Sequence, residues 1–249
     1  MPFLGGVTLP LNDKRGSENL ISGKLAVAKR AAEIIEDGMV IGIGSGTTVE
    51  LFLRELKRRI IEEELEVLGV PSSYQSKLIA VESGIGLVDL IECPELDVCI
   101  DGADEVDKNL NAIKGGGGAM TREKIVAYAS NEVIFIVEER KLVDTLSYPI
   151  PVEVLPFSLG FTIKKLGELM KEFGSTELPR IRQGTGKLGP ITTDNGNFIL
   201  DCDFGKIFDP GELELELNSI PGVFECGIFT DVADKIIVGK DGGETYEIY

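Results

Sequence analysis

Proton transfer in this chain must rely on side chains other than histidine, because the sequence contains none. A Ser-His-Asp or Cys-His nucleophile and a histidine-bound zinc are therefore excluded. The four cysteines form no C-x-x-C pair, which argues against a structural zinc knuckle as well. Carboxylates, lysines, tyrosines and cysteines remain as candidate acids and bases. Three loops combine several of these residues with glycines.

The first loop, residues 42–48, joins an expected strand to an expected helix and places three glycines among hydroxyl side chains. Backbone N–H groups at a helix N-terminus attract anions, and glycine lets an anion approach them closely. A dinucleotide-binding G-x-G-x-x-G motif would need glycine at Thr47, and a Walker A loop would need a lysine. The pattern favours a phosphate monoester bound at Ser45, Gly46, Thr47 and Thr48; a well-capped turn is the alternative.

The second loop, residues 101–107, follows an expected buried strand at the edge of the sheet where α/β proteins bind ligands. Its four acids suggest a calcium loop, but Ala103 breaks the alternation that an EF-hand requires. Asp101 and Asp104 lie three residues apart across Gly102, so both could face the hydroxyls of a sugar. Solvent-exposed turn acids are the alternative interpretation.

The third loop, residues 114–124, contains four consecutive glycines before an expected helix. Such a tract costs backbone entropy without any gain in packing, so a flexible linker is one interpretation. The tract interrupts a regular alternation of strands and helices, however, where a linker between domains is not expected. Lys114 supplies a cation before the glycines. Glu123 lies in the first turns of the following helix, from which its carboxylate could lean over the same pocket.

Strands and helices alternate up to about residue 145, which predicts a parallel α/β sheet. The expected strands cover residues 39–44, 65–70, 97–100 and 133–137, and the expected helices cover residues 18–37, 49–61, 73–82 and the segment up to residue 128. Prolines crowd the chain after residue 146. A helix at 162–173, a hairpin at 191–200 with a type I′ turn at Asn195-Gly196, and a strand at 223–229 are expected there. Residues 212–217 fit a strand or a helix, and two final strands could rejoin the first sheet.

The net charge of −17 argues against a nucleic-acid partner, which requires a basic surface. The sequence shows no signal peptide, and no apolar run approaches the ~18 residues of a membrane span. We therefore expect a cytoplasmic protein without a membrane partner. The acids concentrate after residue 200, so an anion site must be made locally positive by amides and lysines.

Taken in this order, the three loops resemble those of the type A ribose-5-phosphate isomerase family, and residues 141–144, 151–154 and 193–197 add support. The resemblance extends from about Lys24 to the C-terminus. It implies a Rossmann-like parallel-sheet domain, residues 1–145 and 230–249. A smaller α+β, ferredoxin-like domain, residues 146–229, is inserted before the C-terminal strands. It also implies that residues 212–217 form a helix.

The same resemblance implies an aldose-ketose isomerase that interconverts D-ribose 5-phosphate and D-ribulose 5-phosphate through an enediolate, in the non-oxidative pentose phosphate pathway. Glu123 corresponds to the proton-transfer base, with Lys114, Asp101 and Asp104 as further catalytic residues. The family needs no metal or organic cofactor and forms homodimers or homotetramers. A non-catalytic sugar-phosphate sensor on the same fold is the alternative. The implied substrate-binding residues are Ser45, Gly46, Thr47, Thr48, Asp101, Gly102, Ala103, Asp104, Lys114, Gly115, Gly116, Gly117 and Lys141.

Overall fold

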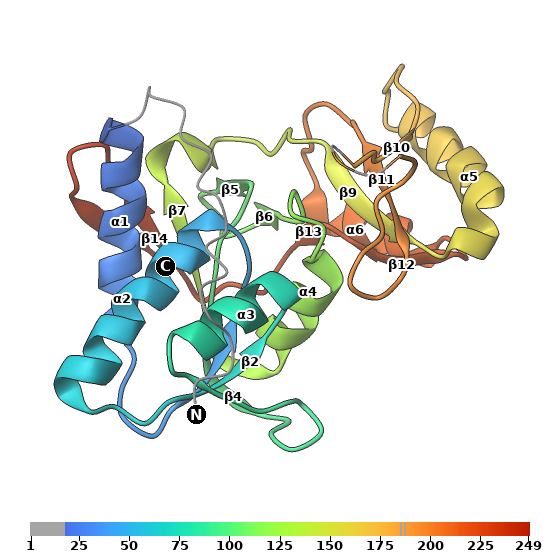
Figure 1. Ribbon diagram of the computed structural model, residues 1–249. Helices are drawn as coiled ribbons and strands as arrows, with labels where there is room; N and C mark the ends of the chain where they lie inside the picture. Colours follow the sequence, from blue (N-terminus) through green and yellow to red (C-terminus); the bar gives the residue numbers. More distant parts are fainter. Residues whose placement is uncertain (1–17, 185, 187) are drawn as a thin grey trace.

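The computed structural model describes residues 18–249 except residues 185 and 187 (Figure 1). Its largest sheet has seven strands in the order β15-β14-β7-β4-β1-β2-β3. All neighbours in this sheet are parallel except the antiparallel pair of β14 and β15. The parallel α/β sheet and the return of the last two strands to it are thus confirmed. The strands are β1 (Val40–Ile43), β2 (Leu68–Pro71), β3 (Gly86–Leu87), β4 (Leu96–Asp101), β7 (Ser130–Glu138), β14 (Lys235–Gly239) and β15 (Thr245–Ile248).

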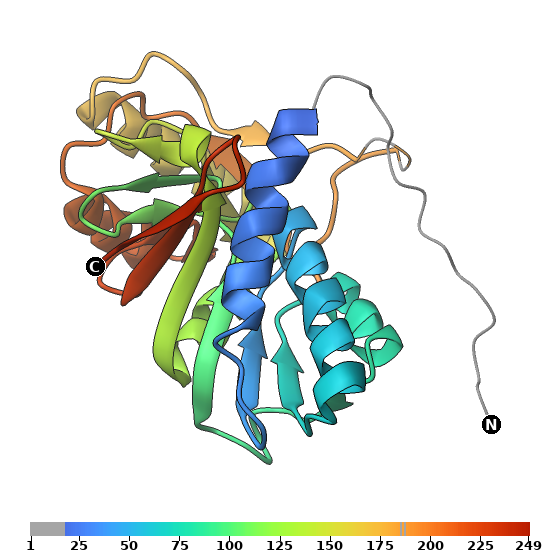
Figure 2. The same ribbon diagram turned by 90° about the vertical axis from the view of Figure 1, so that its left-hand side faces the viewer.

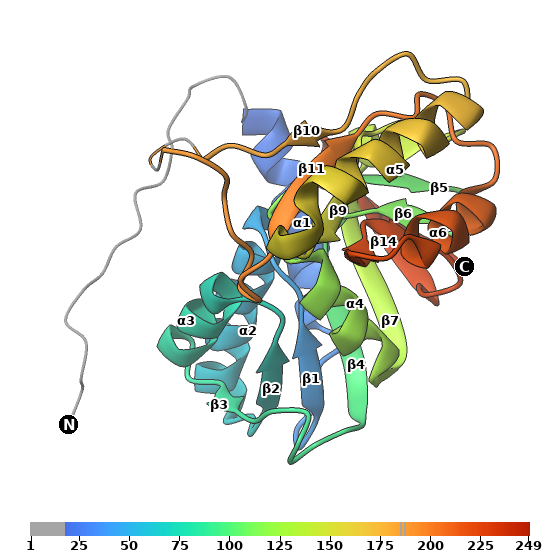
Figure 3. The same ribbon diagram turned by 90° about the vertical axis from the view of Figure 1, so that its right-hand side faces the viewer.

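Helices cover both faces of this sheet, as its apolar strands require. Ile41 and Ile43 of β1 pack in one core with α1 (Glu18–Ala32), α2 (Thr47–Glu63) and α3 (Tyr74–Glu82). Figure 2 shows α1 and α2 lying across that face. Alternate residues of the strands point to the other face, where Cys99 and Val133 pack with α4 (Met120–Tyr128). Figure 3 shows α4 lying over β1, β4 and β7 on that face. No helix in the described part of the chain has the length and apolar character to cross a bilayer.

The first helix rests on the last strands of the chain. A β-carbon on Gly239 of β14 would lie 2.3 Å from the carbonyl oxygen of Gly23 in α1, so the two backbones approach closely. Val27 and Ile237 belong to the same buried cluster. The N-terminal segment whose role the sequence leaves open lies mostly outside the described residues, which begin at residue 18.

A second sheet has four antiparallel strands in the order β10-β11-β9-β12. Together with two helices these strands give the β-α-β-β-α-β succession of ferredoxin-like folds. Apolar residues of both helices, among them Leu166 and Leu213, form one core with Val152 and Leu200 of the sheet. The elements are β9 (Ile150–Val154), α5 (Leu159–Glu172), β10 (Arg180–Ile181), β11 (Phe198–Cys202), α6 (Pro210–Ser219) and β12 (Val223–Cys226). The helix expected at residues 212–217 is confirmed.

The opposite face of the second sheet packs against α4. Every residue of β9 is buried, although only alternate residues face α5 and α6. Ile199 of β11 belongs to the same core as Met120 of α4. The division of the chain at residues 146 and 229 into two domains remains a prediction, which this separate sheet supports.

A third, small sheet in the order β13-β6-β5-β8 was not predicted, because its strands are too short to show a pattern. They are β5 (Glu105–Asp107), β6 (Ala112–Ile113), β8 (Leu142–Val143) and β13 (Ile228–Phe229), and β8 follows the 3₁₀ turn η1 (Glu139–Lys141). The single strand expected at residues 223–229 is wrong, because it breaks at Gly227 into β12 and β13. A β-carbon there would lie 2.2 Å from the carbonyl oxygen of Lys114.

The hairpin expected at residues 191–200 is also wrong: only its second arm, β11, is a strand. A type I′ turn needs positive φ at both central residues, but of Asn195 and Gly196 only Gly196 has it, at 83°. The hydroxyl of Thr193 instead accepts hydrogen bonds from the amides of Asn195 and Asn197, each at 3.2 Å. Local side-chain bonding of this kind competes with a strand ladder.

Candidate active site

A pocket of about 500 Å³ opens at the carboxyl ends of β1 and β4. The chain proceeds from β1 to β2 on one side and returns to β4 on the other, so this is the switch point where α/β sheets bind ligands. The pocket unites all three predicted loops; of the predicted residues, only Asp101 is not part of its wall. It is lined by Ser45, Gly46, Thr47, Thr48, Gly102, Ala103, Asp104, Lys114, Gly115, Gly116, Gly117, Glu123 and Lys141.

Lys114 lies between two carboxylates at the base of the pocket. Its Nζ is 2.9 Å from Oδ2 of Asp101 and 3.3 Å from Oε2 of Glu123, and all three side chains are buried. The ammonium also donates a hydrogen bond to the carbonyl of Gly102. Burial alone would lower the pKa of Lys114, but Asp101 and Glu123 raise it above its ordinary value. Lys114 is therefore a permanent cation in the pocket.

Aromatic rings surround the same ammonium on its inner side. The Nζ of Lys114 lies 5.3 Å from the ring centre of Phe135 and 5.4 Å from that of Phe229. Cations are attracted to ring faces at such distances. The rings add electrostatic stabilisation that a purely aliphatic wall would lack.

Asp101 lies beneath the pocket, and Asp104 lies in its wall. Oδ1 of Asp101 accepts hydrogen bonds from the amides of Ser45, at 3.1 Å, and Gly102, at 2.7 Å. Burial, and then the nearby charge of Glu123, raise the pKa of Asp101 to about 7. Oδ2 of Asp104 accepts from the amide of Gly116 at 2.7 Å. The two acids therefore differ: Asp101 joins the first loop to Lys114, and Asp104 anchors the glycine loop.

The first loop brings the N-terminus of α2 to the pocket. Gly46 is the N-cap of α2, with φ 92° and no side-chain cap, so no hydroxyl or carboxylate competes with a ligand for the helix end. The hydroxyl of Ser45 donates a hydrogen bond to Oε1 of Glu123. This bond links the anion-binding loop directly to the candidate base.

Gly44 is required by the close approach of Asp101. A β-carbon at this position would lie 2.0 Å from the carboxyl carbon of Asp101. We expect Gly44→Ala to reduce the free energy of unfolding by about 1–3 kcal/mol, as overpacked buried sites do, and to lower activity by displacing Asp101. Thermal unfolding and a turnover assay measure both effects. Gly160→Ala in α5 is the control, since nothing lies within 4 Å of its β-carbon; equal unfolding temperatures for the two variants would contradict the prediction.

Two further lysines flank the first loop. Lys141 lines the pocket and donates to the carbonyl of Ala103. Lys24 of α1, which the sequence did not reveal as a site residue, lies 3.0 Å from Oγ1 of Thr47 and 3.2 Å from Oε1 of Glu138. Burial lowers the pKa of Lys24, and the charges of Lys141 and Arg140 lower it further. The positive cluster is assembled from distant segments, so no local motif signals Lys24.

Arg182 fixes the glycine loop from the side of the second sheet. Its guanidinium donates to the carbonyls of Gly115, at 2.8 Å, and Gly116, at 3.1 Å, while Asp201 holds its other edge. The amide of Gly116 is already bound to Asp104. The amide of Gly116, one of the implied substrate-binding residues, is therefore engaged within the protein. No local motif in the sequence indicates the role of Arg182.

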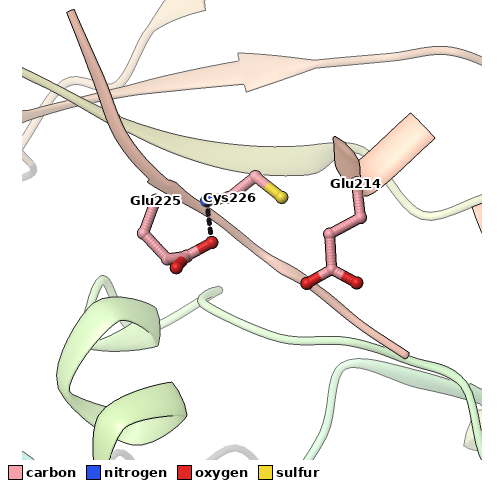
Figure 4. Close-up of side chains that lie close together, drawn as sticks. All are labelled: Glu214, Glu225 and Cys226. Atoms are coloured by element: carbon pink, nitrogen blue, oxygen red, sulfur yellow. Dashed lines mark hydrogen bonds between the residues drawn. The ribbon is translucent and has the colours of Figure 1, made fainter. Parts of the chain in front are cut away.

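One group of side chains outside the pocket has the composition of a metal site: Glu214 of α6 with Glu225 and Cys226 of β12 (Figure 4). The ammonium of Lys124 lies 2.6 Å from Oε1 of Glu214 and 2.7 Å from Oε1 of Glu225. Lysine thus supplies the positive charge that these carboxylates require, and the arrangement is an ion-pair cluster.

The site thus places an uncapped helix N-terminus and a buried lysine between two carboxylates at the switch point of a parallel α/β sheet. These groups are suited to an enzyme that binds an anion and moves a proton without histidine. The chain belongs to the ribose 5-phosphate isomerase A (phosphoriboisomerase A) family, whose model matches residues 68–243. The resemblance inferred from the three loops is thereby confirmed.

The chain aligns with individual relatives along nearly their whole length. The chain is 54% identical to ribose-5-phosphate isomerase A of Archaeoglobus fulgidus, over 88% of this chain and 96% of the relative. The structure of ribose 5-phosphate isomerase A from Methanocaldococcus jannaschii superposes with a TM-score of 0.84 at 48% identity, covering 92% of this chain and 99% of that one. A D-ribose-5-phosphate isomerase in complex with phospho-erythronic acid gives a TM-score of 0.85 at 45% identity, covering 91% and 97%.

Proposed function

We propose that this protein interconverts D-ribose 5-phosphate and D-ribulose 5-phosphate, with Glu123 as the base that moves the proton between C2 and C1. The observation that carries the proposal is the position of Glu123 in the pocket wall, joined to Ser45 of the anion-binding loop and to Lys114. The phospho-erythronic acid complex of the similar isomerase supports a small phosphorylated ligand for this pocket.

The isomerisation needs a base that removes a proton from C2 of the open-chain sugar and returns it at C1. The hydroxyl proton at C2 must also pass to the oxygen at C1, so that the carbonyl moves from C1 to C2. The ion pair with Lys114 and the hydrogen bond from Ser45 hold the carboxylate of Glu123 in one direction. When C2 is deprotonated, negative charge develops on the carbonyl oxygen. The ammonium of Lys114 can stabilise this charge, because it is buried and already in place before the reaction.

The two aspartates have separate roles in this mechanism. Asp101, beneath the pocket, holds Lys114 at 2.9 Å and so sets the position of the ammonium. Asp104 lies in the wall, and its Oδ2 accepts the hydrogen bond from the amide of Gly116. Its Oδ1 remains available to hydroxyls of the sugar. Asp101 is accordingly a positioning residue, and Asp104 binds substrate.

The phosphate group is bound at the N-terminus of α2, where residues 45–48, Lys141 and Lys24 meet. The helix dipole, the uncapped amides and the two ammonium groups all favour a dianion at this place. With the phosphate there, the other end of a five-carbon chain extends toward Glu123 and Lys114. This local positive field is what allows a protein of net charge −17 to bind an anion.

Substitution of the flanking lysines tests this placement of the phosphate. We expect Lys24→Met and Lys141→Met each to raise KM about ten- to hundredfold, the equivalent of one charge-assisted hydrogen bond, and to change kcat only a few-fold. Steady-state kinetics with ribose 5-phosphate measures both constants. Lys164→Met, on the exposed surface of α5, is the control. A fall in kcat at unchanged KM would place these lysines at the reacting carbons instead.

The decisive test of the proposed function is direct. The purified protein is incubated with D-ribose 5-phosphate in a buffer containing a metal chelator, and the formation of ketose is followed with time. Ribulose 5-phosphate should appear until equilibrium is reached, and the reverse reaction should reach the same ratio. Tight binding of the sugar phosphate without any ketose would overturn the proposal. It would favour the sensor, which the isomerase names of the relatives do not.

We also propose that the protein is a homodimer or homotetramer. Two neighbouring segments at the second sheet expose large apolar side chains; the segments meet where the amide of Leu155 bonds to the carbonyl of Gly222. Phe157 is 96% exposed and Phe224 58% exposed, and exposed apolar surface of this kind can mark an interface. Light scattering coupled to size exclusion measures the mass; a monomer at micromolar concentration would contradict this proposal.

A further inference from the structure

The first turn of α4, which carries Glu123, is not fixed by a local cap. Its N-cap residue, Ala119, makes no side-chain hydrogen bond to the helix, and the glycines before it impose no stiffness. Helix ends without partners tend to fray. The turn is nevertheless buried: Met120, Thr121 and Glu123 are all largely inaccessible to solvent. What holds it in place must therefore come from elsewhere in the fold.

Much of that support comes from Glu153, in the middle strand β9 of the second sheet. Its fully buried carboxylate accepts hydrogen bonds from the hydroxyl of Thr121 on α4 and from the hydroxyl of Thr193 at 2.7 Å. The side-chain amides of Asn195, at 3.1 Å, and Asn197, at 2.9 Å, complete the set. All of these donors are neutral, and each directs a hydrogen at an oxygen of Glu153, which thereby fixes where the donors point.

Two further residues of α4 are bound to segments of the second sheet, its helices or its loops. Arg122 donates to Oδ1 of Asn195 at 2.7 Å and to the carbonyl of Asp194 at 2.8 Å. Lys124 is held by Glu214 and Glu225, the two carboxylates drawn in Figure 4. Glu123 is thus flanked in the helix by three residues that contact the second sheet, its helix α6 or its loops. They are Thr121, Arg122 and Lys124.

Helix geometry connects these contacts to the candidate base. Residues of an α-helix are about 100° apart around the axis, so Thr121 and Glu123 project to nearly opposite sides. A bond that holds Thr121 toward the second sheet thereby fixes the rotation of α4 about its own axis. That rotation decides whether Glu123 faces Lys114 and Ser45. A misplacement of about 1 Å at a reacting group can reduce the rate about 10²-fold. We propose that Glu153, acting through the hydroxyl of Thr121, is a positioning residue for Glu123, an inference that rests on the proposed isomerase function.

The test removes the bridging hydroxyl and leaves the buried carboxylate in place. Thr121→Val keeps the shape of the side chain and cannot donate to Glu153, whereas Thr121→Ser keeps the donor. We expect Thr121→Val to lower kcat about ten- to hundredfold with KM for ribose 5-phosphate changed less than about threefold, because the phosphate site is untouched. Thr121→Ser should restore kcat to within a few-fold of that of the unchanged protein.

Thr162→Val is the matched control, since Thr162 is also a buried threonine in the first turn of a helix, α5, with one side-chain hydrogen bond, to Ser158. All variants are assayed well below their unfolding temperatures. Equal kcat for Thr121→Val and Thr162→Val would overturn the positioning role, as would a serine variant as slow as the valine variant. An unchanged protein that forms no ketose would overturn the proposed function and this inference together, so the two failures are distinguishable.

Discussion

Replacing Glu123 with glutamine should abolish isomerisation while the protein still binds ribose 5-phosphate. A general base typically contributes 10²–10⁴-fold to a rate, and no other carboxylate of the pocket wall is joined to both Ser45 and Lys114 in the part of the chain that the structure describes. Glutamine has nearly the same shape, and its carbonyl oxygen can still accept the bond from Ser45. We therefore expect kcat to fall by about 10³-fold or more.

Two measurements make this prediction specific. Calorimetric titration with ribose 5-phosphate should give a dissociation constant within a few-fold of that of the unchanged protein, because the phosphate contacts remain. Exchange of the C2 proton with deuterated solvent should be lost along with turnover. Glu168→Gln, an exposed carboxylate on α5, controls for the loss of a negative charge. Turnover near the normal rate in the Glu123→Gln variant would reject Glu123 as the base.

Replacing Lys114 with methionine should damage both stability and activity. The ammonium is buried between Asp101 and Glu123, and removal of one partner from a buried ion pair typically costs about 3–5 kcal/mol. Loss of the charge that faces the developing oxyanion should lower kcat about 10²–10³-fold in the protein that still folds. Chemical denaturation and steady-state kinetics check the two effects separately.

The stability of this variant should also depend on pH in a definite direction. The pKa of Asp101 is already raised to about 7 with Lys114 present, and loss of the ammonium raises it further. Between the unfolded value near 4 and the folded value, the folded state then binds more protons than the unfolded state. The free energy of unfolding of Lys114→Met should therefore be highest in mild acid and fall as the pH rises beyond about 4. Lys165→Met, with an exposed ammonium on α5, should follow the unchanged protein; the opposite slope would contradict the raised pKa of Asp101.

The sequence was sufficient to predict the pocket because its wall is built from three local motifs. Each motif follows a strand or precedes a helix, and parallel strands bring their carboxyl ends to one edge of the sheet. Glu123 and Lys114 could thus be placed in one pocket before any coordinates were known. Spacing could not distinguish Asp101 from Asp104, since the difference depends on which carboxylate the amides of Ser45 and Gly102 contact.

The residues that sequence analysis missed act over long distances along the chain. Lys24 reaches Thr47 from another helix, and Arg182 reaches the glycine loop from the second sheet. Glu153 stood within a recognised motif, but its role depends on Thr121, Thr193 and two asparagines gathered by the tertiary fold. The hairpin at 191–200 failed for the same reason: its asparagines bind a buried carboxylate instead of pairing two strands.

The packing of α1 on β14 constrains the order in which the parts of the protein can fold during synthesis. β14 lies inside the large sheet, between β7 and β15, and it also supports the helix that carries Lys24. During synthesis α1 and β7 emerge long before residues 235–239. Until β14 is made, the edge of β7 that it will pair with stays unpaired, and this strand contains the apolar residues Ile134 and Ile136. Such edges invite wrong pairing and attract chaperones. The phosphate end of the pocket therefore becomes complete only after residues 235–239 have left the ribosome.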